Sequence, residues 1–197
     1  MIEEAVPEAR GVSDRRPADR TVSRTVAVWD LPLRLWHWAL AASVLVAWFT
    51  PTVYDRLHRL AGYTVLGLLA FRLLWGFLGS RYSRFRMVGV RLRAAPGYLW
   101  NLRRGITGRY IGLNPAGTLM LVALLLALAI SAITGALSVT VTFFGVWWIE
   151  DTHAWSSDAA MVLVVLHVAG VVLMGMLQRE NLIRAMFTGR KRIRSHW

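Results

Sequence analysis

The segment HAWSSDAAMVLVVLHVAGVVLMGML, residues 153–177, begins with one histidine and carries a second near its middle. Its length matches the about 17–25 apolar residues that cross the hydrocarbon of a bilayer as a helix. On such a helix the step from His153 to His167 rises about 21 Å and returns to nearly the same face, about 40° away. One membrane helix is therefore predicted to present two metal-binding side chains at two depths.

Three further apolar stretches have the length of a membrane span. Hydrophobic residues make up 56% of the 197-residue chain and charged residues only 17%, which is more apolar than a soluble domain of this size. The four predicted spans are Leu35–Thr52, Leu57–Leu78, Pro115–Thr140 and His153–Leu177. The sequence thus predicts an all-α fold, an integral membrane four-helix bundle, in one domain over residues 26–192.

Polar segments flank this domain. Residues 1–25 mix acidic residues, arginine and proline with little hydrophobicity, which is typical of a disordered arm. Because this arm precedes the first span, that span is not expected to be a cleaved signal peptide. Residues 193–197 are expected to form a basic tail. Within the chain, Pro96–Arg104 (PGYLWNLRR) is predicted to be a short amphipathic surface helix, either a topology anchor or a docking site.

Basic residues alternate between the predicted loops. Residues 1–34 hold six arginines, residues 79–114 hold eight, and residues 179–197 hold six basic residues. The two remaining loops hold only Arg56 and Arg59, next to acidic residues. This is the positive-inside pattern of a multi-pass membrane protein, with both termini expected in the cytoplasm. Because topology accounts for the net charge of +12, nucleic acid is not an expected partner.

The chain has no cysteine. Disulfides, thiolate-held iron–sulfur clusters and covalent c-type haem attachment are therefore excluded. Any iron must be held by nitrogen, oxygen or thioether ligands, and the histidine positions favour nitrogen.

Four histidines fall into two pairs when depth is estimated from this topology. His37 begins the first span on the cytoplasmic side, and His167 lies at the same inner level. His58 and His153 each begin a span from the outer side. Two neutral imidazoles at one level can supply both axial ligands of a b-type haem in the interior of a bundle. We therefore predict two b-type haems, although any single histidine could instead be a hydrogen-bonded interhelical residue. His196, in the tail, is expected to be uninvolved.

Arginines and glycines near these histidines are secondary candidates. Arg72 follows His58 by the same interval that separates His153 from His167, so it should lie at the inner level. There it is predicted to meet a haem propionate, and the alternative is that its side chain snorkels to the membrane surface. Arg34 and Arg59 are weaker cofactor-binding candidates at the two interfaces. Gly62 and Gly170 follow ligands closely and would let a flat porphyrin approach the backbone, or else serve close helix packing. The third span carries no histidine and is expected to be a structural wall.

Seven stretches resemble one known family, the bacterial cytochrome b561 and nickel–iron hydrogenase cytochrome b group. They are VWDLPLRLWHW around His37, LHRLAGY around His58, FRLLWG around Arg72, YIGLNPAGTLM at the third span, EDTHAW around His153, LHVAGV around His167, and RENLIRAMFTGRKR near the end. The resemblance covers about residues 26–192. It implies a four-helix di-haem membrane cytochrome with His37 and His167 on the inner haem and His58 and His153 on the outer haem.

The resemblance also implies a function. Members pass electrons between quinone and a partner, some as membrane subunits of a periplasmic hydrogenase or another redox enzyme and others alone. The short loop between His37 and His58 favours the partnered kind, an electron-transfer subunit of a quinone-linked oxidoreductase with a periplasmic cytochrome or hydrogenase-like enzyme as partner. The alternatives are a stand-alone superoxide or quinone oxidoreductase, with Arg56 and Arg59 attracting the anion, and a histidine-based metal-ion transporter. No catalytic residue is assigned.

Overall fold

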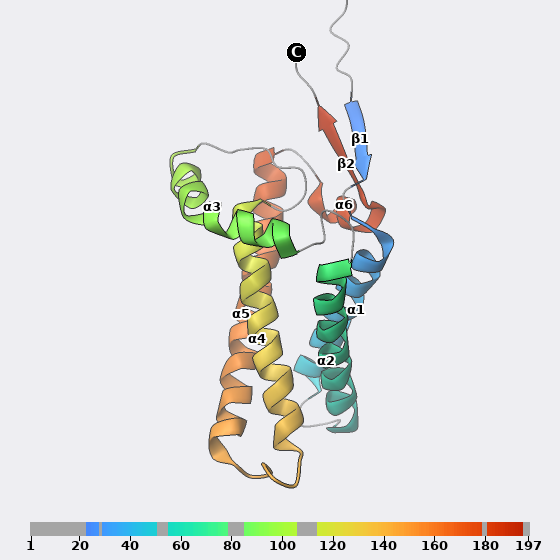
Figure 1. Ribbon diagram of the computed structural model, residues 1–197, viewed down its shortest axis with the longest axis vertical. Helices are drawn as coiled ribbons and strands as arrows, with labels where there is room; N and C mark the ends of the chain where they lie inside the picture. The colour runs from blue at the N-terminus through green and yellow to red at the C-terminus, as the bar shows by residue number, and fades with distance from the viewer. Residues whose placement is uncertain are drawn as a thin grey trace, which may run out of the picture.

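A computed structural model describes residues 23–27, 29–50, 55–78, 85–105, 114–178 and 181–194 of the chain. Six helices and two short strands follow one another in these ranges (Figure 1). They are β1 (Ser23–Ala27), α1 (Leu31–Phe49), α2 (Asp55–Leu78), α3 (Phe85–Arg103), α4 (Pro115–Ser138), α5 (Trp147–Gln178), α6 (Leu182–Thr188) and β2 (Arg190–Arg194). Apart from residues 23–25, the predicted arm lies outside the described residues.

Four helices, α1, α2, α4 and α5, are long and apolar enough to cross a membrane. The predicted all-α membrane bundle is therefore confirmed, with different helix ends. The helix α1 begins at Leu31 because Asp30 caps it, accepting a hydrogen bond from the Leu33 amide at 2.9 Å. The helix α5 begins at Trp147, so His153 lies nearly two turns inside it and not at its start.

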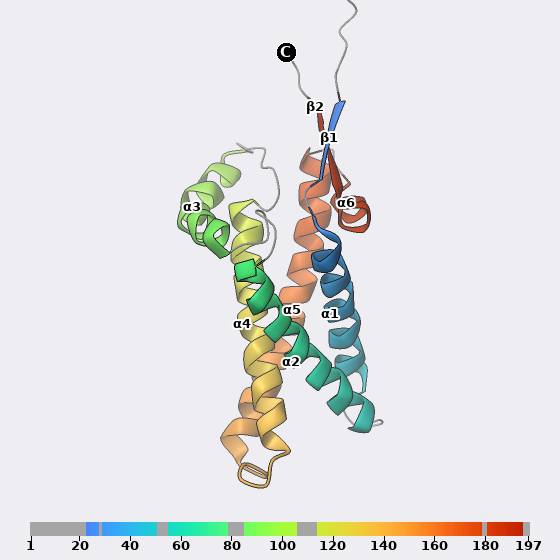
Figure 2. The ribbon, with the colours of Figure 1, turned by 45° about the vertical axis from the view of Figure 1, so that its right-hand side comes forward.

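The spans are arranged as two antiparallel hairpins. The helix α1 packs along α2, α4 packs along α5, and α2 joins the hairpins by packing on α4. Figures 1 and 2 show the α1–α2 pair beside the α4–α5 pair. Within the described residues, α5 makes no comparable backbone approach to α1 or α2. The four candidate histidines lie on α1, α2 and α5.

A small apolar core lies where the two hairpins meet. It consists of Leu33, Trp36, Leu40, Val65, Leu69, Leu128 and Ala160, with members from all four spans. The Trp36 indole also donates a hydrogen bond to the Leu68 carbonyl at 2.7 Å, which ties α1 to α2. In lipid, hydrogen bonds within each helix already pair the backbone N–H and C=O groups. Side-chain contacts such as these therefore determine how the helices associate.

The helix α3 lies across the end of the bundle at which α4 begins (Figure 2). Ala95 and Tyr98 are buried, and the Tyr98 hydroxyl accepts a hydrogen bond from the Asn114 side chain at 3.2 Å. Asn114 is also the N-cap of α4. A helix is therefore present where one was predicted over Pro96–Arg104, but it runs from Phe85 to Arg103 and has Pro96 inside it.

At the same end, the two terminal segments form a clasp, which we define as β1, β2, α6 and Arg34. The strands pair antiparallel, from Ser23 opposite Arg194 to Ala27 opposite Arg190. The ribbon includes residues 23–25 of the predicted arm and residues 193–194 of the predicted tail, since each strand supplies the other's backbone partners. Arg34 donates hydrogen bonds to two carbonyls at the end of α6, those of Met186 (at 3.2 Å) and Phe187.

Gly189 ends α6 in a left-handed conformation, with φ of +74°, and its carbonyl accepts a hydrogen bond from the Trp29 amide at 3.2 Å. A Cβ atom there would lie 2.7 Å from the Trp29 carbonyl oxygen. We expect Gly189→Ala to lower the thermal unfolding temperature of the protein in detergent, because left-handed strain of about 1–2 kcal/mol adds to this clash.

Gly105→Ala is the matched control, because Gly105 has φ of +76° but open space around its Cβ position. It carries the strain without the clash. Equal losses of unfolding temperature in the two variants would show that the Trp29 contact contributes nothing.

Candidate functional site

The structure brings the four predicted histidines together as two facing pairs. The rings of His58, on α2, and His153, on α5, have centres 6.2 Å apart. The rings of His37, on α1, and His167, on α5, have centres 6.4 Å apart. The two pairs stand about 21 Å apart along α5, given its rise per residue.

These separations fit two imidazoles that share one metal ion. An imidazole nitrogen lies about 2 Å from the ion that it coordinates, so rings on opposite sides of one ion have centres about 6 Å apart. The described residues contain no group of three or more histidine, cysteine or carboxylate side chains around a common point. Each pair therefore offers two ligands, the number that a haem iron takes above and below its plane.

Hydrogen bonds fix the ring orientation of the outer pair. Nδ1 of His58 donates to the Ala47 carbonyl at 2.8 Å, and Nδ1 of His153 donates to the Ser131 carbonyl at 2.8 Å. A carbonyl can only accept, so the proton of each neutral ring lies on Nδ1 and the lone pair on Nε2 is left for a metal. Metal-bound histidines commonly have such a second partner, which fixes both tautomer and orientation.

Local backbone structure makes both carbonyls accessible. Ala47 lies in the last turn of α1, where its carbonyl accepts a long backbone hydrogen bond, at 3.5 Å, from the Thr50 amide. Ser131 lies within α4, and Gly135 follows it by one turn. A Cβ atom on Gly135 would lie 2.7 Å from Cε1 and 2.9 Å from Nδ1 of His153. The missing side chain therefore lets the imidazole rest against the α4 backbone.

The inner pair is held differently. Nδ1 of His37 is buried and has no hydrogen-bond partner among the described residues. Its ring instead meets the edge of Trp38, with centres 5.2 Å apart, and Trp38 stacks on Phe187 of α6 at 4.4 Å. A buried imidazole nitrogen without a partner costs free energy unless a ligand or water engages that nitrogen. The clasp thus contacts the residue next to an inner histidine.

Two glycines that the sequence singled out face open space. A Cβ atom on Gly62 or on Gly170 would meet no atom within 4 Å. Close packing against a neighbouring helix does not explain these glycines, since no described neighbour lies there. The space, the sparse packing of α5 against α1 and α2, and the paired rings fit two flat macrocycles bound between the hairpins.

The three candidate arginines occupy different surroundings. Arg72 is only 4% exposed, lies 5.7 Å from the centre of the Trp36 ring and interacts electrostatically with Asp30. Asp30 is thus an acidic neighbour within the chain itself, in addition to the propionate predicted from the sequence. The guanidinium of Arg34 is engaged by α6, and that of Arg59 pairs with Asp55 at 2.6 Å in an exposed position.

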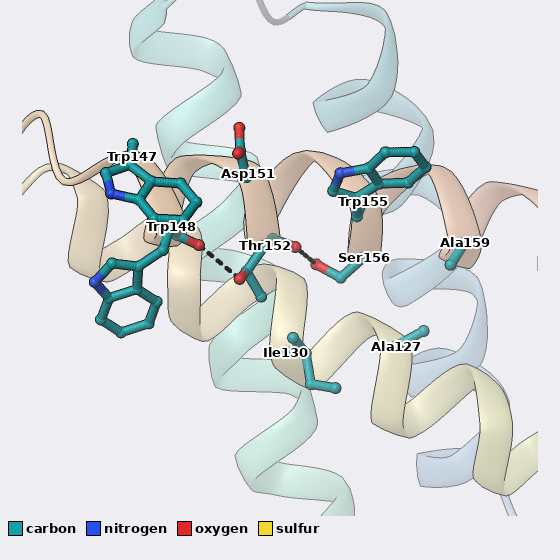
Figure 3. A pocket seen from close by; sticks show the side chains of 9 residues that line it. All are labelled: Ala127, Ile130, Trp147, Trp148, Asp151, Thr152, Trp155, Ser156 and Ala159. Carbon is teal, nitrogen blue, oxygen red and sulfur yellow. Dashed lines mark hydrogen bonds between the residues drawn. The ribbon is translucent and has the colours of Figure 1, made fainter.

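An open pocket of about 550 Å³ lies on α4 and α5, and its lining includes none of the four histidines (Figure 3). Trp147, Trp148 and Trp155 surround it and are exposed, as expected of a tryptophan belt at a membrane boundary. Thr152 and Ser156 lie between these tryptophans. Each hydroxyl donates a hydrogen bond to the backbone carbonyl one turn earlier, in both cases at 2.6 Å. The pocket is therefore a surface feature, separate from the histidine pairs.

Sequence reasoning missed three contributors to the site. Gly135 was assigned to a purely structural span, although its missing Cβ makes room for His153. Asp30 was overlooked, although an acidic residue before Leu-Pro is a recognisable N-cap. Phe187 has no local signal, because only the fold brings α6 against Trp38.

Comparison with known proteins identifies the family of the chain. A family model described as prokaryotic cytochrome b561 matches residues 28–189. A probable Ni/Fe-hydrogenase B-type cytochrome subunit from Azotobacter chroococcum mcd 1 is 30% identical, covering 83% of this chain and 87% of its own length. A protein of the same description from Bradyrhizobium diazoefficiens is 27% identical over 97% of this chain and 96% of its own. No solved structure gave a significant match. The chain therefore belongs to the prokaryotic cytochrome b561 family and is a multi-pass membrane protein of electron transfer that binds haem b.

Proposed function

We propose that this protein is a di-haem cytochrome that carries electrons across a bacterial inner membrane between a redox partner at the outer face and quinone. His58 and His153 would hold the outer haem b, and His37 and His167 the inner one. The bound haem iron supplies the one-electron redox chemistry. The observation that carries the proposal is the presence of two facing imidazole pairs, with ring centres 6.2 and 6.4 Å apart, at two levels of one helix.

The chain's own residues would prepare each site before the cofactor arrives. The Ala47 and Ser131 carbonyls hold the outer rings in the tautomer that ligates through Nε2. The Trp38–Phe187 stack restrains the start of α1 beside His37. The apolar span surfaces exclude water, and burial of this kind is one means by which a protein tunes the potential of a bound metal.

Both termini are proposed to face the cytoplasm. The ribbon of β1 and β2 joins the two terminal segments at one end of the bundle, which supports a common side. The arginine-rich segment with α3 adjoins that same end (Figure 1), and the opposite end has only short connections. Loops rich in arginine and lysine are retained on the cytoplasmic side of bacterial membranes.

The partner at the outer face is proposed to be a hydrogenase-like enzyme. Two of the relatives compared above are described as probable B-type cytochrome subunits of Ni/Fe hydrogenases. Purification in mild detergent, followed by identification of the retained proteins, tests this part.

Quinol added to the isolated cytochrome should reduce its haem, which is read from the visible absorption, whereas an unchanged spectrum would count against quinone as the other partner.

The number of haems tests the central claim. A pyridine haemochrome assay on purified protein should give two haems b for each chain. One haem for each chain, or none with adequate haem supply, would contradict the proposal.

The ligand pairing predicts which histidine variants resemble each other. His58→Ala and His153→Ala should each leave one haem, and low-temperature spectra of the two variants should superimpose, because both have lost the outer site. His37→Ala and His167→Ala should both lose the inner haem and keep the spectral component of the outer haem. If His58→Ala and His153→Ala remove different spectral components, the pairing is wrong.

Gly135→Ala should selectively lower occupancy of the outer site, because the new Cβ atom would overlap the His153 ring. Alanine is favoured over glycine within a helix by about 1 kcal/mol, so α4 itself should not be weakened. Haem content measured by the same assay should fall from two towards one for each chain.

Gly67→Ala provides the matched control on α2, where a Cβ atom meets nothing within 4 Å. It should keep both haems. A Gly135→Ala protein with two haems and an unaltered spectrum would show that the ring does not depend on this gap.

A further inference from the structure

The helix α3 has a second face that is exposed in the described part of the chain. Ala95 and Tyr98 are buried towards α4, whereas Arg93, Trp100 and Arg104 are exposed. Positions 93, 100 and 104 share one side of a helix, because seven and four residues are close to whole numbers of turns. The chain therefore turns a tryptophan and two arginines away from the bundle.

Arg103, next to Arg104 in the chain, is also exposed. The Arg104 guanidinium carbon lies 4.9 Å from the centre of the Trp100 ring, and Trp100 is 56% exposed. Residues 79–114 contain eight arginines and no acidic residue, so this segment has no counter-charge of its own. We call Arg93, Trp100, Arg103 and Arg104 the α3 basic face.

The connections of α3 fix its depth. It follows the end of one membrane span, α2, and precedes the start of another, α4, to whose N-cap Tyr98 is bonded. The helix thus lies at the boundary between hydrocarbon and water, where tryptophan is enriched and arginine meets the surface potential of anionic lipids. Exposed Val90 and Leu99 on the same helix add apolar surface that a purely aqueous helix would not retain.

We propose that the α3 basic face binds the headgroups of anionic phospholipids. The guanidinium groups would donate charge-assisted hydrogen bonds to phosphate oxygens, and Trp100 would lie at the headgroup level. The position of this face between the ends of two membrane spans, with exposed Val90 and Leu99 on the same helix, favours lipid headgroups over an acidic protein. This proposal does not depend on the number or the ligands of the haems.

Native mass spectrometry of the holoprotein in a neutral detergent tests it, with phosphatidylglycerol and phosphatidylcholine of matched acyl chains as probes. The wild-type protein should bind phosphatidylglycerol more tightly, and the preference should shrink in 1 M salt, where screening shortens to about 3 Å. Equal affinity for both lipids at low salt would overturn the proposal without any variant.

The double variant Arg93→Gln/Arg104→Gln localises the site. Each arginine near an anionic surface contributes about fivefold in affinity, so the double variant should bind phosphatidylglycerol about 25-fold more weakly. Trp100→Leu should weaken both lipids, and Trp100→Phe should restore part of the loss.

Arg184→Gln/Arg190→Gln is the matched control, because both arginines are exposed and lie near the same end of the bundle, on α6 and β2. It removes the same charge away from α3. If it weakens phosphatidylglycerol binding as much as the α3 variant does, the attraction belongs to the whole surface and the proposed site is wrong. Unchanged haem spectra would show that both variants are folded.

Discussion

One geometric relation connects the helices of the bundle: two imidazoles face each other at each of two levels, with ring centres 6.2 and 6.4 Å apart. The helix α5 supplies one histidine to each level, and these rings face His58 of α2 and His37 of α1. In the described residues α5 packs closely along α4 and has no comparable backbone packing against the other hairpin. The α4 backbone approaches the His153 ring at Gly135.

Polar contacts hold this arrangement where apolar burial cannot. Within a bilayer, hydrophobic surface gains little by moving from lipid to protein, so hydrogen bonds and small residues decide which helices associate. The Ser131 and Ser157 hydroxyls lie 2.7 Å apart between α4 and α5, and the Trp36 indole bonds to the α2 backbone. The histidine–carbonyl bonds belong to the same set and also orient the His58 and His153 rings, so one group of contacts supports both the fold and the candidate site.

The two ends of the molecule differ in construction. One end carries α3, α6 and the ribbon, so three segments distant in sequence meet there, and Arg34 joins α1 to the end of α6. The other end has a turn over residues 139–146 and the exposed tryptophans of α5. Arg34 therefore serves to fasten the clasp, a role that its proximity to His37 in sequence did not suggest, because the partner carbonyls lie about 150 residues away.

The sequence by itself determined the four spans and the levels of the histidines, because span length and helical rise depend only on local geometry and on the thickness of the bilayer. The N-caps at Asp30 and Asn114 were also readable locally. Only the tertiary structure decided which carbonyls receive the rings of His58 and His153, that Asp30 lies near Arg72, and that Phe187 stacks on Trp38. Those contacts join residues from different helices, and their geometry follows from how the hairpins pack, which no local pattern encodes.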